Sequence, residues 1–220
     1  MQKKNTQAIP LSIKTKGKKL KADLELLRSK ALELGAAGAE IIRANQLVVD
    51  ERVRLKCSIP RCLRVGETPN CPPHAPDLDL VRKAFARYSY GILIKTLVEP
   101  LEDYAPGKSR DNSGTDRSLL FHQKTAKIVY EIERMAYQHG YALAMGLGGG
   151  SCKDYLCHGL VCQFMDSGRC RFPLRARPAM EALGIDVVDI ISKVGWSAYP
   201  LLGEASEIPC ATSVGLVLID

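Results

Sequence analysis

Hydrophobic and polar positions alternate along the chain between helix-like and strand-like spacing. From Lys21 to Ala36, leucine and alanine recur at helical spacing up to Gly35, which predicts an amphipathic helix. Residues 39–44 and 46–57 are rich in β-branched residues with partial alternation, and they predict one or two strands that lead directly into Cys57. The proline-rich stretch 58–76 is expected to be a loop.

The rest of the chain continues the same alternation. Asp77 is a suitable N-cap for the helix that follows it. A later short helix is expected to begin at Pro178, which suits a first turn, and to end at Gly184, while the negative charge of Glu181 is favourable near the helix N-terminus. An exposed loop is expected over 99–115. The remaining elements are helices at 77–86, 116–139, 178–184 and 186–192, and strands at 90–98, 141–147 and 214–220. The sequence therefore predicts a layered α/β domain in which helices flank a mixed β-sheet.

Composition sets the broad class of the protein. The chain has 220 residues, 46% of them hydrophobic and 25% charged, which is ordinary for a globular domain with its own core. We expect a single α/β domain over 21–220, preceded by a basic, partly disordered N-terminal tail over 1–20. The net charge of +7 permits a nucleic-acid partner, but no aromatic residues are interleaved with the basic run, which argues against one.

No stretch resembles a membrane span or an export signal. The chain has no run of about 18 apolar residues, and its basic start lacks an apolar core segment. We therefore expect no membrane partner and a cytoplasmic location. In that reducing compartment disulfides are disfavoured, and clustered cysteines more often bind metal or carry out redox chemistry.

The eight cysteines form two groups in loops that follow predicted strands. The first is Cys-x4-Cys-x8-Cys and the second is Cys-x4-Cys-x4-Cys-x7-Cys, while the eighth cysteine stands apart; in order they are Cys57, Cys62 and Cys71, then Cys152, Cys157, Cys162 and Cys170, then Cys210. Four cysteines within nineteen residues is a density typical of metal sites. Functional loops are commonly held in this way at the ends of strands.

Iron–sulfur clusters fit these groups better than zinc does. Structural zinc sites favour Cys-x2-Cys pairs, and the chain contains none. Clusters tolerate wider ligand loops and are often accompanied by proline after a ligand, as at Cys71-Pro72 and shortly after Cys170. The spacing matches neither the bacterial nor the plant ferredoxin pattern. Zinc therefore remains the alternative cofactor.

The neighbours of the cysteines suggest cofactor-binding groups. Basic residues flank both groups and could offset the negative charge of a cluster, among them Arg171 and Arg177, although they could equally solvate the loops or hold an anionic substrate. Gly148, Gly149 and Gly150 could present backbone amides to cluster sulfurs, or form a plain turn. His74 and His158 could be substitute ligands, but a role as ordinary loop histidines is favoured for both. His122 and His139 lie on the long predicted helix, where surface or helix-end roles suffice.

Three segments carry a resemblance to a known family. "CSIPRCLRVGETPNCPPHAPD", "GYALAMGLGGGSCKDYLC" and "CRFPLRARPAMEALGIDV" resemble a prokaryotic family described as predicted metal-binding proteins, over approximately Val49 to Gly195. The resemblance implies metal bound by cysteine, with iron–sulfur as the expected type, and no particular reaction. The second cysteine group is more widely spaced here than in the family pattern, which leaves open whether Cys157 and Cys162 are both ligands.

The expected function is electron transfer or redox chemistry on one or two [4Fe–4S] clusters, with a redox partner protein. One cluster would be bound by the four cysteines of the second group. The other would be bound by Cys57, Cys62 and Cys71, with Cys210 as its fourth ligand or with one iron open to a substrate, which would make the protein an enzyme. The alternative is a structural zinc protein that recognises another macromolecule. The sequence gives no oligomeric state.

Overall fold

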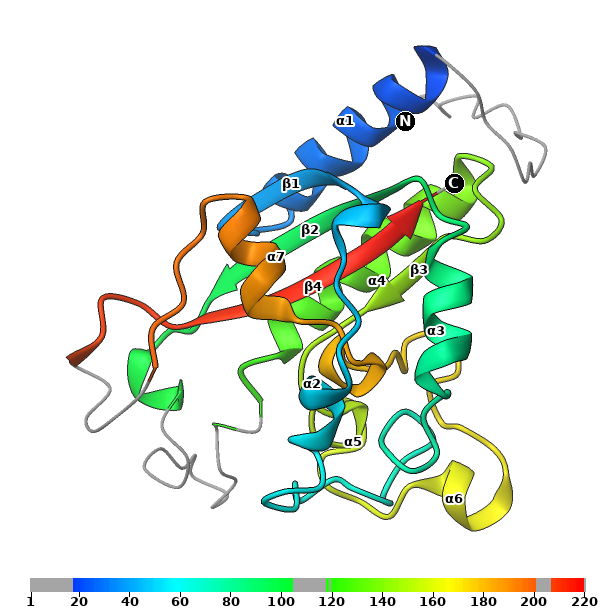
Figure 1. Ribbon diagram of the computed structural model, residues 1–220, viewed down its shortest axis with the longest axis vertical. Helices are drawn as coiled ribbons and strands as arrows, with labels where there is room; N and C mark the ends of the chain where they lie inside the picture. Colours follow the sequence, from blue (N-terminus) through cyan, green and yellow to red (C-terminus); the bar gives the residue numbers. More distant parts are fainter. Residues whose placement is uncertain (1–17, 105–117, 119, 201–206, 220) are drawn as a thin grey trace, which may run out of the picture.

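The computed structural model describes residues 18–104, 118, 120–200 and 207–219, and its centre is a four-stranded sheet (Figure 1). The strand order is β1-β2-β4-β3. The strands are β1 (Gly38–Arg43), β2 (Tyr90–Leu97), β3 (Met145–Leu147) and β4 (Thr212–Ile219). Each neighbouring pair is antiparallel. The long β2 and β4 pair along their whole lengths, from Tyr90 opposite Ile219 to Leu97 opposite Thr212.

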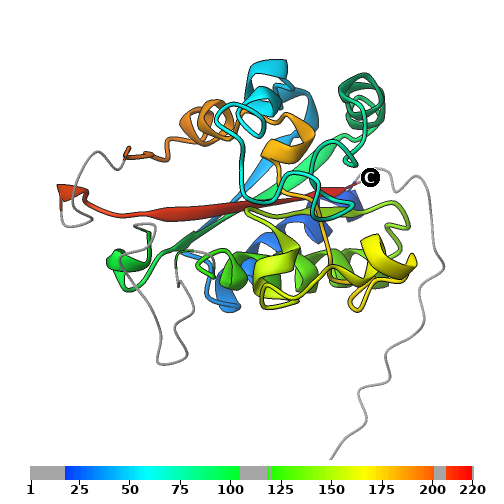
Figure 2. The same ribbon diagram turned by 90° about the horizontal axis from the view of Figure 1, so that it is seen from below.

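Helices cover both faces of the sheet, so the domain has three layers (Figure 2). One face carries the longest helices, α1 (Lys18–Glu33) and α4 (Gln123–Gln138), together with the short α5 (Cys152–Tyr155) and α6 (Gln163–Ser167). The other face carries α2 (Glu51–Leu55), α3 (Leu78–Phe85), α7 (Val187–Lys193) and the 3-10 turn η4 (Glu181–Leu183). Two further 3-10 turns are η1 (Ala44–Gln46) and η2 (Leu101–Tyr104).

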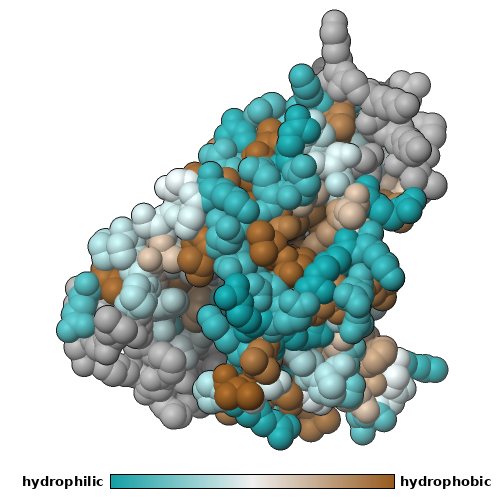
Figure 3. All heavy atoms as spheres, viewed as in Figure 1, coloured by the Kyte–Doolittle hydropathy of each residue, from teal (hydrophilic) through white to brown (hydrophobic). Residues whose placement is uncertain are grey.

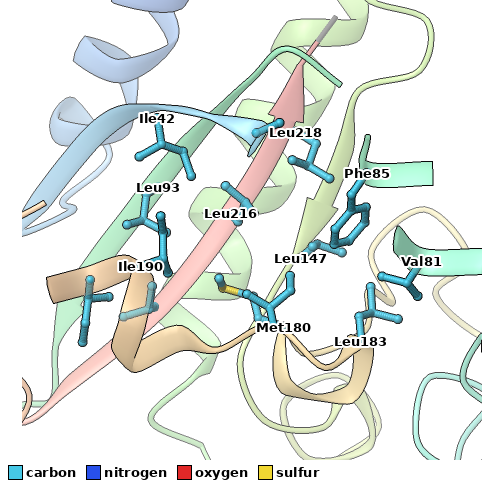
Figure 4. Close-up of a cluster of buried hydrophobic side chains, with 14 residues drawn as sticks. Ile42, Val81, Phe85, Leu93, Leu147, Met180, Leu183, Ile190, Leu216 and Leu218 are labelled. Atoms are coloured by element: carbon cyan, nitrogen blue, oxygen red, sulfur yellow. The ribbon is translucent and has the colours of Figure 1, made fainter. Parts of the chain in front are cut away.

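Alternate residues of the central strands enter two separate cores. On β2, Ile92 and Ile94 pack with α1 and α4, whereas Leu93 points into the opposite core with Met180 and Ile190 (Figure 4). Burying a side chain of this size stabilises the fold by about 1.5–3 kcal/mol. Because both faces of the sheet are covered, β2 and β4 are nearly continuous runs of hydrophobic residues.

The α/β class with one layered sheet is confirmed, but the expectation of a mixed sheet is wrong. Among the described strands all pairings are antiparallel, and parallel pairing is confined to an isolated bridge between Gly148 and Ala179. Continuous apolar runs are typical of parallel strands covered by helices on both faces. Here the same burial is reached by an antiparallel sheet, so periodicity alone could not distinguish the two arrangements.

Several predicted elements differ in extent. Residues 46–57 are not a strand; η1 ends at Gln46, and α2 follows, with the Asp50 carboxylate accepting a hydrogen bond from Arg52 N at 2.7 Å. The first helix begins at Lys18, inside the predicted tail, whose residues 1–17 lie outside the described residues. The predicted helix 116–139 is shorter, since α4 begins at Gln123, and the predicted strand 141–147 begins only at Met145.

Other sequence predictions hold. Asp77 caps α3 as predicted, since its carboxylate accepts a hydrogen bond from the backbone N–H of Asp79. The helix predicted over 186–192 is observed as α7, with Asp186 as its N-cap residue. Most of the predicted loop 99–115 lies outside the described residues, and its described part contains η2. None of the helices in the described ranges is long and apolar enough to cross a membrane.

Candidate metal centre

The first cysteine segment, residues 57–76, is a succession of turns that begins where α2 ends. Cys57 N donates to Arg54 O at 3.1 Å, and Cys62 N donates to Cys57 O at 2.9 Å. Further along, Cys71 N donates to Thr68 O at 3.2 Å. The guanidinium of Arg54 reaches across the loop and donates to the carbonyls of Ala75 and Pro76, at 3.2 and 2.9 Å. The loop predicted over 58–76 is therefore confirmed, and its shape is fixed by its own backbone.

The second cysteine segment, residues 148–172, follows β3. Ser151 caps the short helix α5 and places Cys152 at its first position. Cys162 occupies the N-cap position of α6, and Cys170 Sγ accepts a hydrogen bond from Phe172 N at 3.3 Å. Both segments lie at the same end of the molecule, the lower end in Figure 1.

Charged side chains join the two segments. Arg64 of the first segment pairs with Asp154 of the second, whose side chain is only 7% exposed. Arg64 also pairs with Glu67 at 3.3 Å, and Glu67 in turn pairs with Lys153. The pKa of Glu67 is lowered, mainly by its hydrogen bond from Lys153. This chain of four charges crosses twice between the segments, so it sets their spacing.

Cysteines of both segments lie near the contact between the segments. Cys71 Sγ lies 3.9 Å from Ser151 Oγ, next to Cys152, and Asn70 Nδ2 donates to Cys152 Sγ at 3.5 Å. Cys57, Cys62 and Cys71 line one cavity of about 390 Å³, which we call the thiol cavity. Cys152 has Cys71, Cys157 and Cys162 as electrostatic neighbours. The structure thus brings cysteines from both sequence groups into one neighbourhood.

Cys210 is placed differently. It lines a second cavity of about 300 Å³, which we call the aromatic cavity because Tyr104, Phe121 and Tyr199 form part of its wall. The two cavities share His122 and Glu181 as lining residues. Cys210 is thus close to the thiol cavity but is not part of its lining. All eight cysteines are free thiols.

The thiols fit a metal chemically. Burial raises the pKa of Cys152 to about 12, and burial followed by the neighbouring Cys62 raises that of Cys57. Such thiols keep their protons at neutral pH until a metal displaces them. The buried hydroxyl of Tyr155, a near neighbour of Cys152 and Cys71, has no hydrogen-bond partner in the described part of the chain. In those same ranges, no three Cys, His, Asp or Glu side chains stand close enough to hold a single ion.

Packing explains two of the three predicted glycines, Gly149 and Gly150. Gly148 donates to Pro178 O and accepts from Met180 N, both at 2.9 Å, so its backbone groups are already used. At Gly149 and Gly150 a Cβ atom would overlap the ring of His122. Glycine is required here because the imidazole lies directly against the backbone. Contact of these residues with a cofactor stays a prediction.

The two predicted arginines already have partners within the protein. Arg177 Nε donates to both carboxylate oxygens of Glu133, at 2.8 and 3.0 Å, and its Nη1 donates to the carbonyls of Pro173 and Ala176. Arg171 donates to Val161 O at 2.8 Å and so closes the loop around α6. A direct role toward a cofactor remains a prediction for both. The helix predicted over 178–184 is only the turn η4, which ends at Gly184 with φ +75°.

Two predicted histidines lie at the surface. His74 is exposed, and His158 lines a surface cavity beside α4. His122, for which a surface or helix-end role was expected, is the N-cap residue of α4 and also lines both the thiol cavity and the aromatic cavity. The sequence signal connected with it is the run of three glycines at 148–150, two of which lie against the His122 ring. Glu181 lines the same two cavities, although the sequence predicted for it only a favourable negative charge near a helix N-terminus.

The surface around the two segments is partly hydrophobic (Figure 3). Ile59 and Leu63 of the first segment are 69% and 75% exposed, and Val161 of the second is 70% exposed. Exposed apolar side chains that gather on one surface commonly mark interaction sites.

Comparison with known proteins identifies a family for this chain. The family model described as predicted metal-binding protein (DUF2284) matches residues 40–219. The chain belongs to this family of predicted metal-binding proteins. Searches of curated proteins and of solved structures return no match.

Proposed function

We propose that this protein is an iron–sulfur protein of a reducing compartment, the cytoplasm, and that it transfers electrons through a [4Fe–4S] cluster held by thiolates of both cysteine segments. The observation that carries the proposal is the shared thiol cavity, lined by Cys57, Cys62 and Cys71, with Cys152 adjacent to Cys71. Thiolates are soft ligands that select iron–sulfur clusters, zinc or copper(I).

The spread of the thiols supports a cluster. They stand around a cavity rather than at one point, and a four-iron cluster needs ligands at the corners of a larger object than one ion. Hydrogen-bond donors also stand close by. Asn70 Nδ2 already reaches a cysteine sulfur, and the unpartnered Tyr155 hydroxyl is available to a sulfur acceptor. Donors of this kind tune the reduction potentials of clusters.

We infer that Cys152, and not Cys210, completes the ligand set of the thiol cavity. The side chains of Asn70 and Ser151 link the two cysteines, since Asn70 contacts Cys152 and Ser151 contacts Cys71. Cys210 instead lines the aromatic cavity, which shares only His122 and Glu181 with the thiol cavity among the described residues. Cys157, Cys162 and Cys170 would then be candidates for a second centre. The exposed apolar side chains at this end would contact the redox partner protein.

Purification without oxygen tests the proposal. We expect a brown protein that contains iron and acid-labile sulfide in equal amounts, with a visible absorption that dithionite bleaches and air restores. Reduction should produce a paramagnetic signal in the EPR spectrum. A colourless protein with stoichiometric zinc would instead establish the structural alternative, and a brown protein that cannot be reduced and reoxidised would reject electron transfer.

A further inference from the structure

The surface cavity beside α4 is separate from the thiol cavity and from the aromatic cavity. Its volume is about 490 Å³. One wall is the face of α4 that carries Gln123, Lys127 and Tyr130. The other wall comes from the second cysteine segment and the residues just after it, on the same side of the sheet as α4 (Figure 2), through Tyr155, Leu156, His158, Phe172 and Arg175. The face of α4 that packs on the sheet is a different one, which includes Ile128 and Ile132.

Arg175 is held over an aromatic ring of this cavity. Its guanidinium carbon lies 5.1 Å from the centroid of the Tyr130 ring, which is a cation–π distance. The backbone N–H of Arg175 donates to Phe172 O at 3.0 Å and fixes the turn that carries the side chain. In the described part of the chain, its guanidinium has neither a hydrogen-bond acceptor nor an ion-pair partner. The Tyr130 ring therefore orients a cation whose five N–H donors are free for a ligand.

The charges that line the surface cavity are not balanced. Lys127, on the wall opposite Arg175, likewise has no ion-pair partner among the residues that the structure describes. The carboxylate in the lining belongs to Glu131, which is already paired with Arg134 at 2.7 Å. A cavity lined by uncompensated charges of one sign concentrates ligands of the opposite sign. The surface cavity therefore favours an anion.

Aromatic and aliphatic side chains form much of the remaining lining. Tyr155 is buried, Tyr130 and Phe172 are half-buried, and Ala126 and Leu156 lie among them. Aromatic side chains bind flat ring systems through offset stacking or edge contacts. A cavity of this size, with apolar walls and a few polar groups, is typical of small-molecule sites. The lining thus suits a flat ring system that carries an anionic group.

We propose that the surface cavity binds an aromatic mononucleotide, with its phosphate bound by Lys127 and Arg175 and its ring system against Phe172. A phosphate monoester carries a charge of about −1.5 to −2 at neutral pH, so it matches two cations better than a carboxylate does. The guanidinium fork donates two parallel hydrogen bonds to phosphate oxygens. Flavin and purine mononucleotides share this chemistry. The proposal does not rest on electron transfer, because the surface cavity and the thiol cavity share no lining residue among those described.

Probes with and without the phosphate test the proposal. The two pairs are flavin mononucleotide with riboflavin, and adenosine monophosphate with adenosine. We expect equilibrium dialysis of the full chain to show that the phosphorylated member of a pair binds about tenfold more tightly, a difference of about 1.4 kcal/mol. Ribose 5-phosphate, which lacks the ring system, should bind about tenfold more weakly than the preferred mononucleotide. A preference in the flavin pair, in the purine pair or in both identifies the ring system that the cavity accepts.

A matched pair of variants assigns the preference to Arg175. Arg175→Gln removes the charge and should reduce the ratio within a pair to about threefold or less. Arg169→Gln is the control, since Arg169 is an exposed arginine of the second cysteine segment that does not line the surface cavity, and it should leave the ratio unchanged. The wild-type preference should also decrease as salt is raised from about 0.05 to 0.5 M, which tests the charge without any substitution.

Several results would overturn the proposal. These are equal affinities within both pairs, no binding of any probe, or ribose 5-phosphate binding as tightly as the mononucleotides. A preference that is insensitive to salt, is kept in Arg175→Gln or is lost in Arg169→Gln would overturn it as well.

Discussion

Arg64 of the first cysteine segment is ion-paired with the buried Asp154 of the second, 90 residues further along the chain. The hydrogen bond that Arg64 donates to Asp154 raises the pKa of the guanidinium further above its ordinary value, although burial opposes this effect. Removing one partner of an enclosed pair leaves the other charge poorly compensated. The pair therefore helps to hold the two cysteine segments together, alongside the pair of Lys153 with Glu67.

We expect Asp154→Asn to lower the free energy of unfolding by about 3 kcal/mol, because Arg64 loses its enclosed partner. The measurement is urea denaturation of the metal-free protein, read as a change in midpoint at constant slope. Glu131→Gln is the matched control, since it removes an exposed pair with Arg134 on α4 and should change stability by less than about 0.5 kcal/mol. Equal effects of the two variants would show that the Arg64–Asp154 pair does not join the segments.

Cysteine replacements distinguish the two candidate fourth ligands. Cys71→Ala and Cys152→Ala should each reduce bound iron strongly, because each removes a thiolate at the junction of the segments. Cys210→Ala should keep the iron content and the visible spectrum of the wild type, because Cys210 lines the aromatic cavity. Iron analysis of proteins purified without oxygen is the readout. Loss of iron in Cys210→Ala would restore Cys210 as the fourth ligand.

The close approach of His122 to the backbone makes Gly150 intolerant of any side chain. Gly150 has φ +62°, and a Cβ atom there would overlap the His122 ring. Gly168 has φ +73° with nothing within 4 Å of its Cβ position, so Gly168→Ala should cost only the left-handed backbone penalty of about 1 kcal/mol. We expect Gly150→Ala to cost about 1–3 kcal/mol more, as overpacking does. Equal melting temperatures for the two variants would contradict this contact.

Acidification should destabilise the protein through His122. Its pKa falls from 6.5 to about 4 on folding because the ring is buried. Between these values the unfolded chain holds more protons than the folded one, so stability decreases as the pH falls from 6.5 to 4. The loss should reach about 3 kcal/mol at the lower end. Denaturation curves across this range should have a smaller pH slope in His122→Gln, and an unchanged slope would assign the effect to other groups.

Much of the fold could be predicted because its signals are local. The Asp77 cap and the apolar runs of β2 and β4 each depend on residues close together in sequence, and all are observed. The antiparallel pairing was missed because apolar runs report burial and not strand direction. The segment 46–57 was misread because its β-branched residues resemble a strand, although Asp50 caps α2 within it.

The site was predictable only in part. The cysteine spacing identified the two loops, but no local pattern could show that Asn70 and Ser151 connect Cys71 to Cys152. His122 was overlooked because its role depends on Ser213, 91 positions away, and on two glycines in another segment. Contacts of this kind form only once the layers have assembled.

The two cysteine segments come from opposite layers of the molecule. The first leaves the side of the sheet that carries α2 and α3, and the second continues into the side that carries α4 (Figure 2). Their junction lies at the lower end of the molecule in Figure 1. A bound metal would therefore link two helical layers that the sheet otherwise separates. Chelation should accelerate amide hydrogen exchange in both segments first. Backbone amides near Asp23 of α1, which accepts a hydrogen bond from the Tyr141 hydroxyl at 2.8 Å, should stay protected from exchange for longer.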